Sequence, residues 1–232
     1  MVYTGNMDTK TEERLKQLNT AFLAINEDIN LSAFRTDQSC WIGNILDSMA
    51  AADMLKKLSI IHSPLSIIDV GTGGGFPLLP LAILFKEFSW TGVDSTKKKI
   101  DAIERIVQEM SIKNVQLICD RAETLGKHPK HREQYDVVTA RAVAEINVLL
   151  EYASPFTKPG GKIILWKSME IQEELQASRN AQKELQCGLI DQHVYALPGD
   201  FGKRQLLIFE KTGKLSATYP RAIGIAKKKP LR

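Results

Sequence analysis

The stretch "IIDVGTGGGFP" (residues 67–77) decides the fold. It reads as a buried strand that runs into a cluster of glycines, followed by an apolar segment. Glycine lets the backbone turn sharply and approach a ligand where a Cβ atom would clash. We therefore expect a ligand at the end of this strand. The alternative is a glycine-rich turn that binds nothing.

The spacing of the glycines separates three kinds of ligand loop. A dinucleotide fingerprint that starts at Gly71 needs glycine at position 76, where the sequence has Phe76. A phosphate loop needs a following G-K-[ST], which is absent from the sequence. What remains is an acidic residue followed by alternate glycines, a pattern typical of S-adenosylmethionine sites. Its members are Asp69, Gly71, Gly73 and Gly75. We expect Asp69 to hold the cationic amino end of the methionine.

Short β-rich runs recur along the chain at 65–70, 88–94, 114–120, 135–141 and 160–167. Strands that alternate with helical crossovers indicate a parallel sheet covered on both faces. A polar helix is expected over about 169–186. Two further runs, 191–197 and 204–211, are separated only by "PGDFGK", which is too short for a parallel crossover, so they predict an antiparallel hairpin. The predicted fold is α/β: a Rossmann-like, class I methyltransferase three-layer sandwich around a mostly parallel seven-stranded sheet.

Three segments are expected. Residues 1–63 form an N-terminal helical extension, with Leu15, Leu18, Phe22 and Ile25 at helical spacing and a loop within "NEDINLSAFR" (26–35). Residues 64–211 form the S-adenosylmethionine-binding methyltransferase domain. Residues 212–232 form a basic C-terminal tail.

Composition excludes several classes of protein. The 232 residues are 44% hydrophobic and 25% charged, as in ordinary globular proteins. No apolar run approaches the roughly 20 residues of a membrane span, and the N-terminus lacks the apolar stretch of a signal peptide. The three cysteines are odd in number and lack CxxC spacing, so neither a disulfide framework nor a metal site is expected. These features favour a cytoplasmic protein without a membrane partner.

The net charge of +4 is unevenly distributed. The extension has six Lys and Arg against eight Asp and Glu, the central domain has 19 of each, and the tail has six basic residues and no acidic one. Basic tails commonly contact nucleic acid, but many are merely solvated ends.

Two further strand ends carry residues suited to the cofactor. Asp94 ends the second strand, 23 residues after Gly71, where a carboxylate accepts hydrogen bonds from ribose hydroxyls. The alternative role is a helix cap, shared with Ser95. Backbone groups near Ala122, after the third strand, suit the adenine edge. Arg141 follows the fourth strand, where its guanidinium suits the methionine carboxylate or an RNA phosphate. The alternative for Arg141 is an ion pair with Glu123 or Glu145.

The absent motifs indicate the acceptor atom. Cys119 is read as a buried residue inside a strand, which argues against a nucleophilic cysteine. The position after the fourth strand reads "TARAV" (139–143) and lacks the [ND]-P-P-[YFW] loop of N6-adenine methylation. None of the histidines, at 62, 128, 131 and 193, lies at a predicted strand end in the cleft. We therefore assign no catalytic residue, and we favour an acceptor that loses no proton, such as guanine N7.

The set of motifs resembles one family: the bacterial small-subunit rRNA guanine-N7 methyltransferases, also known as glucose-inhibited division protein B. The matching segments, in order, are "NLSAFR", "ILDS" (45–48), "DVGTGGGFP", "VDS" with "KK" (93–98), "RAE" (121–123), "TARAVA" (139–144), "PGGKIILWK" (159–167) and "YPRAIGIAKKKPL" (219–231). The resemblance implies methylation of one guanine in the 530-loop region of 16S rRNA, within the small ribosomal subunit. It also implies cofactor contacts at Gly71, Phe76, Ala122, Glu123 and Arg141.

The chain departs from the family pattern at two places. Asn44 stands where the family usually has histidine, and Leu78 and Leu79 follow the glycine loop where small residues are common. Two other functions remain open: a class I methyltransferase that acts on a small molecule or protein, and a non-catalytic RNA-binding scaffold. The candidate RNA-binding residues are Arg35, Lys167, Arg204, Arg221, Lys227, Lys228 and Lys229.

Overall fold

A computed structural model describes residues 7–61, 63–141 and 144–232. Within these residues, seven strands form one sheet in the order β3-β2-β1-β4-β5-β7-β6. The strands are β1 (Ser66–Val70), β2 (Ser89–Asp94), β3 (Val115–Cys119), β4 (Tyr135–Ala140), β5 (Thr157–Lys167), β6 (Cys187–Ala196) and β7 (Lys203–Lys211). The first five are parallel, and β7 lies antiparallel between β5 and β6. The predicted seven-stranded sheet with its C-terminal hairpin is confirmed.

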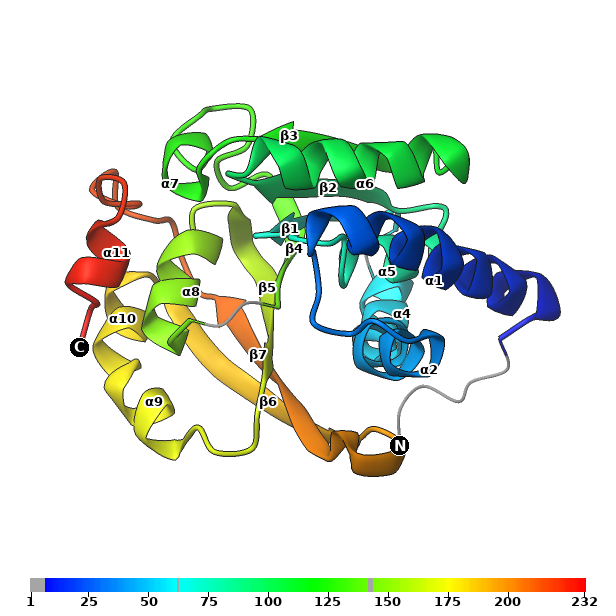
Figure 1. Cartoon of the computed structure of the whole chain (residues 1–232). Coiled ribbons are helices and arrows are strands. Elements are labelled where there is room, and N and C mark those ends of the chain that lie inside the picture. Colours follow the sequence, from blue (N-terminus) through cyan, green and yellow to red (C-terminus); the bar gives the residue numbers. More distant parts are fainter. Residues whose placement is uncertain (1–6, 62, 142–143) are drawn as a thin grey trace.

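The helical elements are α1 (Thr9–Ile29), α2 (Asp37–Cys40), the π-helix η1 (Trp41–Leu46), α3 (Asp47–Met49), α4 (Ala52–Ile61), α5 (Leu78–Leu84), α6 (Lys97–Glu109), α7 (Ala122–Leu125), α8 (Ile146–Ala153), α9 (Gln172–Ala177), α10 (Arg179–Glu184), the 3-10 helix η2 (Gly199–Phe201) and α11 (Ile225–Lys228). Figure 1 shows α1, α4 and α5 on one side of the sheet and α8, α10 and α11 on the other.

The sheet is buried on both faces because alternate side chains of each strand point to opposite sides. In β1, Ile67 belongs to the apolar cluster under α1, α5 and α6, whereas Ile68 belongs to the cluster under α8. The N-terminal extension contributes Leu15, Phe22 and Leu55 to the first cluster, so it shares a core with the sheet. No helix among the described residues has both the length and the apolar character to cross a membrane.

The extension is held in place by local polar contacts. Asp8 caps α1 by accepting a hydrogen bond from Thr11 N (2.9 Å). The buried Asn26 side chain fixes the following turn, because its Oδ1 accepts from Leu31 N (2.7 Å) and Ser32 N (2.8 Å). The helix runs to Ile29, so the expected loop at 26–35 begins later than its sequence suggested.

Other expectations were wrong in detail. The polar helix over 169–186 is two short helices, divided at Ser178, whose hydroxyl donates to Leu175 O (2.7 Å). Such a local bond competes with the continuing helix. Cys119 is exposed rather than buried, because β3 is an edge strand. His193 is exposed on β6, and His62 lies outside the described residues.

Candidate functional site

The glycine loop connects the ends of β1 and β2. Gly71 N and Thr72 N donate to Val93 O at 2.8 and 3.0 Å, and Gly73 N donates to the Asp94 carboxylate at 3.0 Å. Gly71 has φ +75°, in the left-handed region that favours glycine. A Cβ atom on Gly71 would meet nothing within 4 Å. The loop is therefore tied to β2, while the Gly71 position faces open space.

Asp69, at the end of β1, is a buried carboxyl that is only partly satisfied. Its Oδ1 accepts from the Thr139 hydroxyl (2.7 Å), and within the described residues its Oδ2 is buried without a hydrogen-bond partner. Burial raises the pKa of this carboxyl to about 6, and the hydroxyls of Thr139 and Thr72 only partly offset that effect. An unpaired buried carboxylate oxygen is costly. A cationic amino group is the kind of partner that satisfies it, so the residues present fit the amino end of S-adenosylmethionine.

One cavity brings together five of the predicted cofactor residues. Its lining includes Gly71, Asp94, Ser95, Ala122 and Glu123. These residues follow β1, β2 and β3, because the carboxyl ends of adjacent parallel strands share one crevice. The rest of the lining is Val70, Val93, Asp120, Arg121, Ala144, Leu149, Tyr152 and Lys227.

Asp94 and Glu123, two of the three carboxylates that line this cavity, are held by backbone amides. Asp94 accepts from Gly73 N and, at 2.9 Å, from Thr96 N at the start of α6. It therefore ties the glycine loop to the turn before α6 and also lines the cavity, whereas the N-cap of α6 is Thr96. Glu123 is 5% exposed and accepts from Gly224 N (3.0 Å). Burial and the nearby Glu123 raise the pKa of Tyr152 to about 12, so this phenol is neutral at pH 7.

Arg141 lies in a network with the N-terminal extension. Its Nη1 donates to Gly43 O (3.1 Å) and pairs with Asp47 Oδ2 (3.0 Å), while Nη2 donates to Asn44 Oδ1 (2.8 Å). Its guanidinium carbon lies 5.5 Å from the centroid of the Phe76 ring. An ion pair was the alternative role expected for Arg141, and the structure shows that pair with Asp47. The expected partners, Glu123 and Glu145, were wrong.

Asp47 is the central acidic residue of this network, and sequence reasoning missed it. The residue is 1% exposed, and its Oδ1 accepts from the Tyr195 hydroxyl (2.6 Å). Its backbone oxygen accepts from Trp166 Nε1 (2.8 Å), and Arg204 Nε lies 3.8 Å from Oδ1. In the sequence, Asp47 is the aspartate of "ILDS" (45–48), a segment that supported the family resemblance but was given no role of its own. Asp47 therefore joins the extension to β5, β6 and the residue after β4.

A second hollow of about 390 Å³ lies beside this network. Gly43 forms part of its wall, and a Cβ atom there would lie 2.3 Å from the Phe34 ring, so only glycine fits. Since Arg141 borders the hollow and also lies over Phe76 of the glycine loop, it connects the two parts of the site. The full lining is Ser32, Phe34, Gly43, Asn44, Asp47, Arg141, Trp166, Lys167, Ser168 and Arg204.

The candidate RNA-binding residues differ in exposure and in whether their side chains already bond to other parts of the protein. Arg221 makes paired hydrogen bonds to the buried Glu151, including one of 2.9 Å from Nε, so its guanidinium already has a partner on α8. Lys167 Nζ donates to Ala144 O (2.9 Å) and pairs with Glu174 (2.7 Å). Arg35 donates to Asn26 O (3.3 Å). The exposed candidates in the tail are Lys227, Lys228 and Lys229.

Comparison with known sequences identifies close relatives. A family model described as rRNA small subunit methyltransferase G matches residues 11–206. A protein named Ribosomal RNA small subunit methyltransferase G from Carboxydothermus hydrogenoformans is 39% identical over 206 residues, which cover 89% of this chain and 86% of its own. The protein of that name from Staphylococcus aureus (strain bovine RF122 / ET3-1) is 38% identical over 224 residues, covering 95% of this chain and 92% of its own.

Solved structures resemble the chain in fold. M. jannaschii TYW2, determined in complex with AdoMet, has a TM-score of 0.51 and 16% identity over 69% of this chain and 75% of its own. Precorrin-6y C5,15-methyltransferase from Geobacter metallireducens GS-15 has a TM-score of 0.50 and 15% identity over 70% of this chain and 86% of its own. At these identities the likeness concerns the fold alone, which is that of class I methyltransferases.

Proposed function

Because the chain belongs to the family of rRNA small subunit methyltransferase G, we propose that it methylates N7 of a guanine in the 530-loop region of 16S rRNA. The methyl donor is S-adenosylmethionine. The observation that carries the proposal is the cavity that joins Gly71, Asp94 and Glu123, with the Asp69 carboxyl, whose Oδ2 lacks a hydrogen-bond partner among the described residues, two positions before Gly71 in the chain. A substrate in the small ribosomal subunit would be met in the cytoplasm.

Each part of the site has a role in this reaction. When bound, S-adenosylmethionine supplies an electrophilic methyl group on a positively charged sulfur. Asp69 holds the amino end, Asp94 accepts from the ribose hydroxyls and the backbone at Ala122 meets the adenine edge. Guanine N7 carries a free lone pair, so no residue has to remove a proton before attack. The protein's contribution is then to orient the base and exclude water.

The hollow bordered by Arg141 is the proposed place of the target base. Its size, about 390 Å³, falls in the range of roughly 300–1,000 Å³ that is usual for small-ligand sites. Phe34 and Trp166 supply aromatic walls, and Arg204, which is 35% exposed, supplies a donor at the rim. Asn44 holds Arg141 at this border through a hydrogen bond of 2.8 Å.

The direct test is mass mapping of 16S rRNA methylation. Small subunits from cells that lack this protein are incubated with the pure enzyme and S-adenosylmethionine, and the modified nucleotide is located by digestion and mass spectrometry. One added methyl group on a 530-loop guanine, at N7, is the expected product. A methyl group on another RNA, or none in the presence of bound cofactor, would contradict the proposed acceptor.

Cofactor affinity is expected to depend on pH through Asp69. The carboxyl pKa of about 6 lies above its usual value, so the group takes up a proton as the pH falls through 6. Since a cationic amino group binds the ionised form, the Kd for S-adenosylmethionine should rise about tenfold between pH 7 and pH 5. Calorimetry across this range measures the change.

The Asp69→Asn variant is the control for this pH dependence. It should bind the cofactor weakly and with a flat pH profile. It should also unfold no more easily than the native protein at pH 7, because a raised carboxyl pKa means that ionisation costs folded stability as the pH rises through 6. A native profile without pH dependence would remove Asp69 from the amino site.

The exposed tail lysines are expected to contact rRNA phosphates. Changing Lys228 and Lys229 together to glutamine should weaken binding to small ribosomal subunits and flatten its dependence on salt, because fewer counterions are released. Cofactor affinity should stay near the native value, because Lys227, which lines the cofactor cavity, is left unchanged. Filter binding at several salt concentrations measures the slope. An unchanged slope would assign these lysines to solvent.

A further inference from the structure

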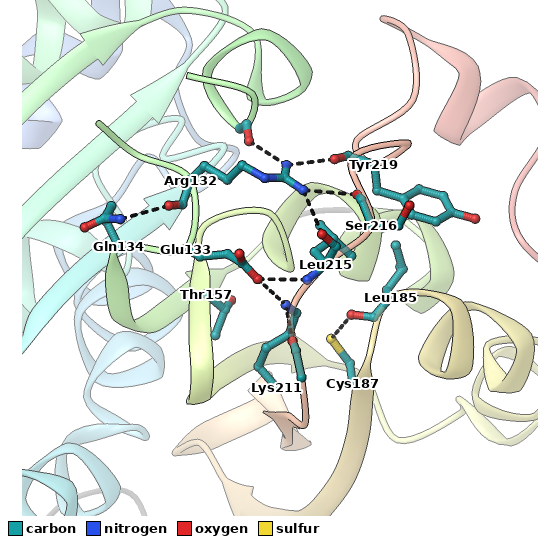
Figure 2. Close-up of polar contacts among 12 residues, drawn as sticks. Arg132, Glu133, Gln134, Thr157, Leu185, Cys187, Lys211, Leu215, Ser216 and Tyr219 are labelled. Atoms are coloured by element: carbon teal, nitrogen blue, oxygen red, sulfur yellow. Dashed lines mark hydrogen bonds and ion pairs between the residues drawn. The ribbon is translucent and has the colours of Figure 1, made fainter. Parts of the chain in front are cut away.

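The C-terminal tail (residues 212–232) is fixed at its start by one arginine. The Arg132 guanidinium donates to three carbonyl oxygens of the tail: Leu215 O (3.2 Å), Ser216 O (3.0 Å) and Tyr219 O (2.8 Å). A fourth bond reaches Gly126 O (3.2 Å) in the loop after α7. Figure 2 shows this fork of bonds. The tail therefore leaves β7 in a defined direction.

A buried ion pair supports the same turn. Lys211 is fully buried, and its Nζ donates to Glu133 Oε1 (3.0 Å) and to Gly213 O (2.8 Å). The same Glu133 oxygen accepts from Leu215 N at 2.9 Å. Both partners have further hydrogen bonds, as a buried charge requires (Figure 2).

The second half of the tail lies along α8. Besides the paired bonds from Arg221 to Glu151, Asn147 Nδ2 donates to Leu231 O (3.2 Å). Ala226 in α11 is buried. Because α8 also carries Tyr152, which lines the cofactor cavity, the tail runs beside that cavity.

One tail residue lines the cavity, and another contacts a residue of its wall. Gly224 N donates to Glu123 Oε1 at 3.0 Å, and Glu123 is part of the cavity lining. Lys227 is also part of the lining. A hydrogen bond to a nearly buried carboxylate holds that carboxylate in one orientation.

We propose that the C-terminal tail is part of the cofactor site: Gly224 is a positioning residue that orients Glu123 toward the adenosine half of S-adenosylmethionine. The inference rests on the proposed use of this cofactor but not on the identity of the RNA acceptor. The tail then has two separate tasks. Gly224 and Lys227 serve the cofactor, while Lys228 and Lys229 face the substrate.

The conformation of Gly224 makes the inference testable. Its φ is +79°, and a Cβ atom there would meet nothing within 4 Å. A substitution therefore adds no clash, and its effect comes from the backbone angle that aims the N–H at Glu123. Asparagine tolerates this region far better than a β-branched residue does. Gly224→Val should turn the N–H away, and Gly224→Asn should restore its direction.

The experiment measures the affinity of three probes by calorimetry: S-adenosylmethionine, S-adenosylhomocysteine and 5′-methylthioadenosine. The last has the adenosine half but no amino-acid end. In Gly224→Val the Kd of all three should rise by about tenfold, since a charge-assisted hydrogen bond is lost. In Gly224→Asn all three should return to within about threefold of the native value. Asp69→Asn should instead weaken the first two and spare 5′-methylthioadenosine.

Gly199→Val is the matched control. Gly199 has φ +63° and also no atom within 4 Å of a built Cβ, but it lies between β6 and β7 and not in the cavity lining. The Gly199→Val variant should bind all three probes with native affinity. If Gly224→Val does not fold, Arg132→Met, which removes the fork at the start of the tail, is measured with the same probes and should show the same uniform loss.

Three outcomes would overturn the inference. The first is native affinity for all three probes in folded Gly224→Val, or in Arg132→Met where that variant replaces it. The second is an equal loss in Gly199→Val, and the third is a native protein that binds none of the probes. If the native protein binds the probes but methylates no 16S rRNA, the acceptor assignment fails while the role of Gly224 stands.

Discussion

The Gly71→Leu variant should bind no measurable S-adenosylmethionine, with affinity reduced at least a hundredfold, and should still fold. Gly71 lines the cavity, and a Cβ atom there meets no other atom within 4 Å, so a larger side chain takes up space that the cofactor needs. The folded protein bears only the cost of φ +75° for a residue with a side chain, about 1–2 kcal/mol. Calorimetry with S-adenosylmethionine, together with thermal unfolding, checks both parts.

A matched variant separates the cavity from the backbone angle. Gly160, in β5, has φ +82° and likewise no atom within 4 Å of a built Cβ, but it does not line the cavity. Gly160→Leu should lose similar stability and keep native cofactor affinity. Equal binding by the two variants would show that Gly71 does not face the cofactor.

The Asp47→Ala variant should lower the free energy of unfolding by about 3 kcal/mol, because it leaves the Arg141 guanidinium and the buried Tyr195 hydroxyl without their carboxylate. For a chain of this size the melting temperature should fall by roughly 6–12 °C. Methylation should fall too, since Arg141 loses its anchor at the border of the hollow. Scanning calorimetry and a methyl-transfer assay measure the two losses.

Two other variants show how much of the stability loss in Asp47→Ala comes from the buried contacts of Asp47. Tyr195→Phe removes one of the hydrogen bonds to Asp47 and should cost about 1 kcal/mol. Asp101→Ala breaks an exposed pair with Lys97 and should leave the melting temperature within about 1 °C. If Asp47→Ala behaved like Asp101→Ala, the extension would not be held to the sheet through this carboxylate.

The parts of the site that sequence could predict are those set by local pattern. The alternation of strands and crossovers predicts the parallel sheet, and a parallel sheet places successive strand ends in one crevice. That is why Gly71, Asp94 and Ala122 line one cavity as expected. Their positions depend on the residue order within short segments and on no distant contact.

The parts that sequence could not predict depend on register between distant segments. Asn44 in the π-helix and Asp47 at the start of α3 contact Arg141, which lies more than 90 positions later in the chain. Nothing in the sequence near Arg141 points to Asn44 or Asp47, so the alternative role of Arg141 was an ion pair with Glu123 or Glu145. Cys119 was misjudged for a similar reason: whether a strand is central or at an edge follows from the strand order, which the apolar pattern does not state.

The residues that line the cofactor cavity come from distant parts of the chain, which bears on when the cavity forms during refolding. Its first members, at the ends of β1 and β2, are neighbours in the sheet, but Lys227 arrives from the far end of the same chain through the docking of the tail on α8. Contacts between segments that are distant in sequence form slowly, because the chain loses conformational entropy in closing the loop before the contact stabilises it. Since the tail docks on α8, which itself packs on the sheet, we expect cofactor binding to return in refolding no earlier than the sheet does.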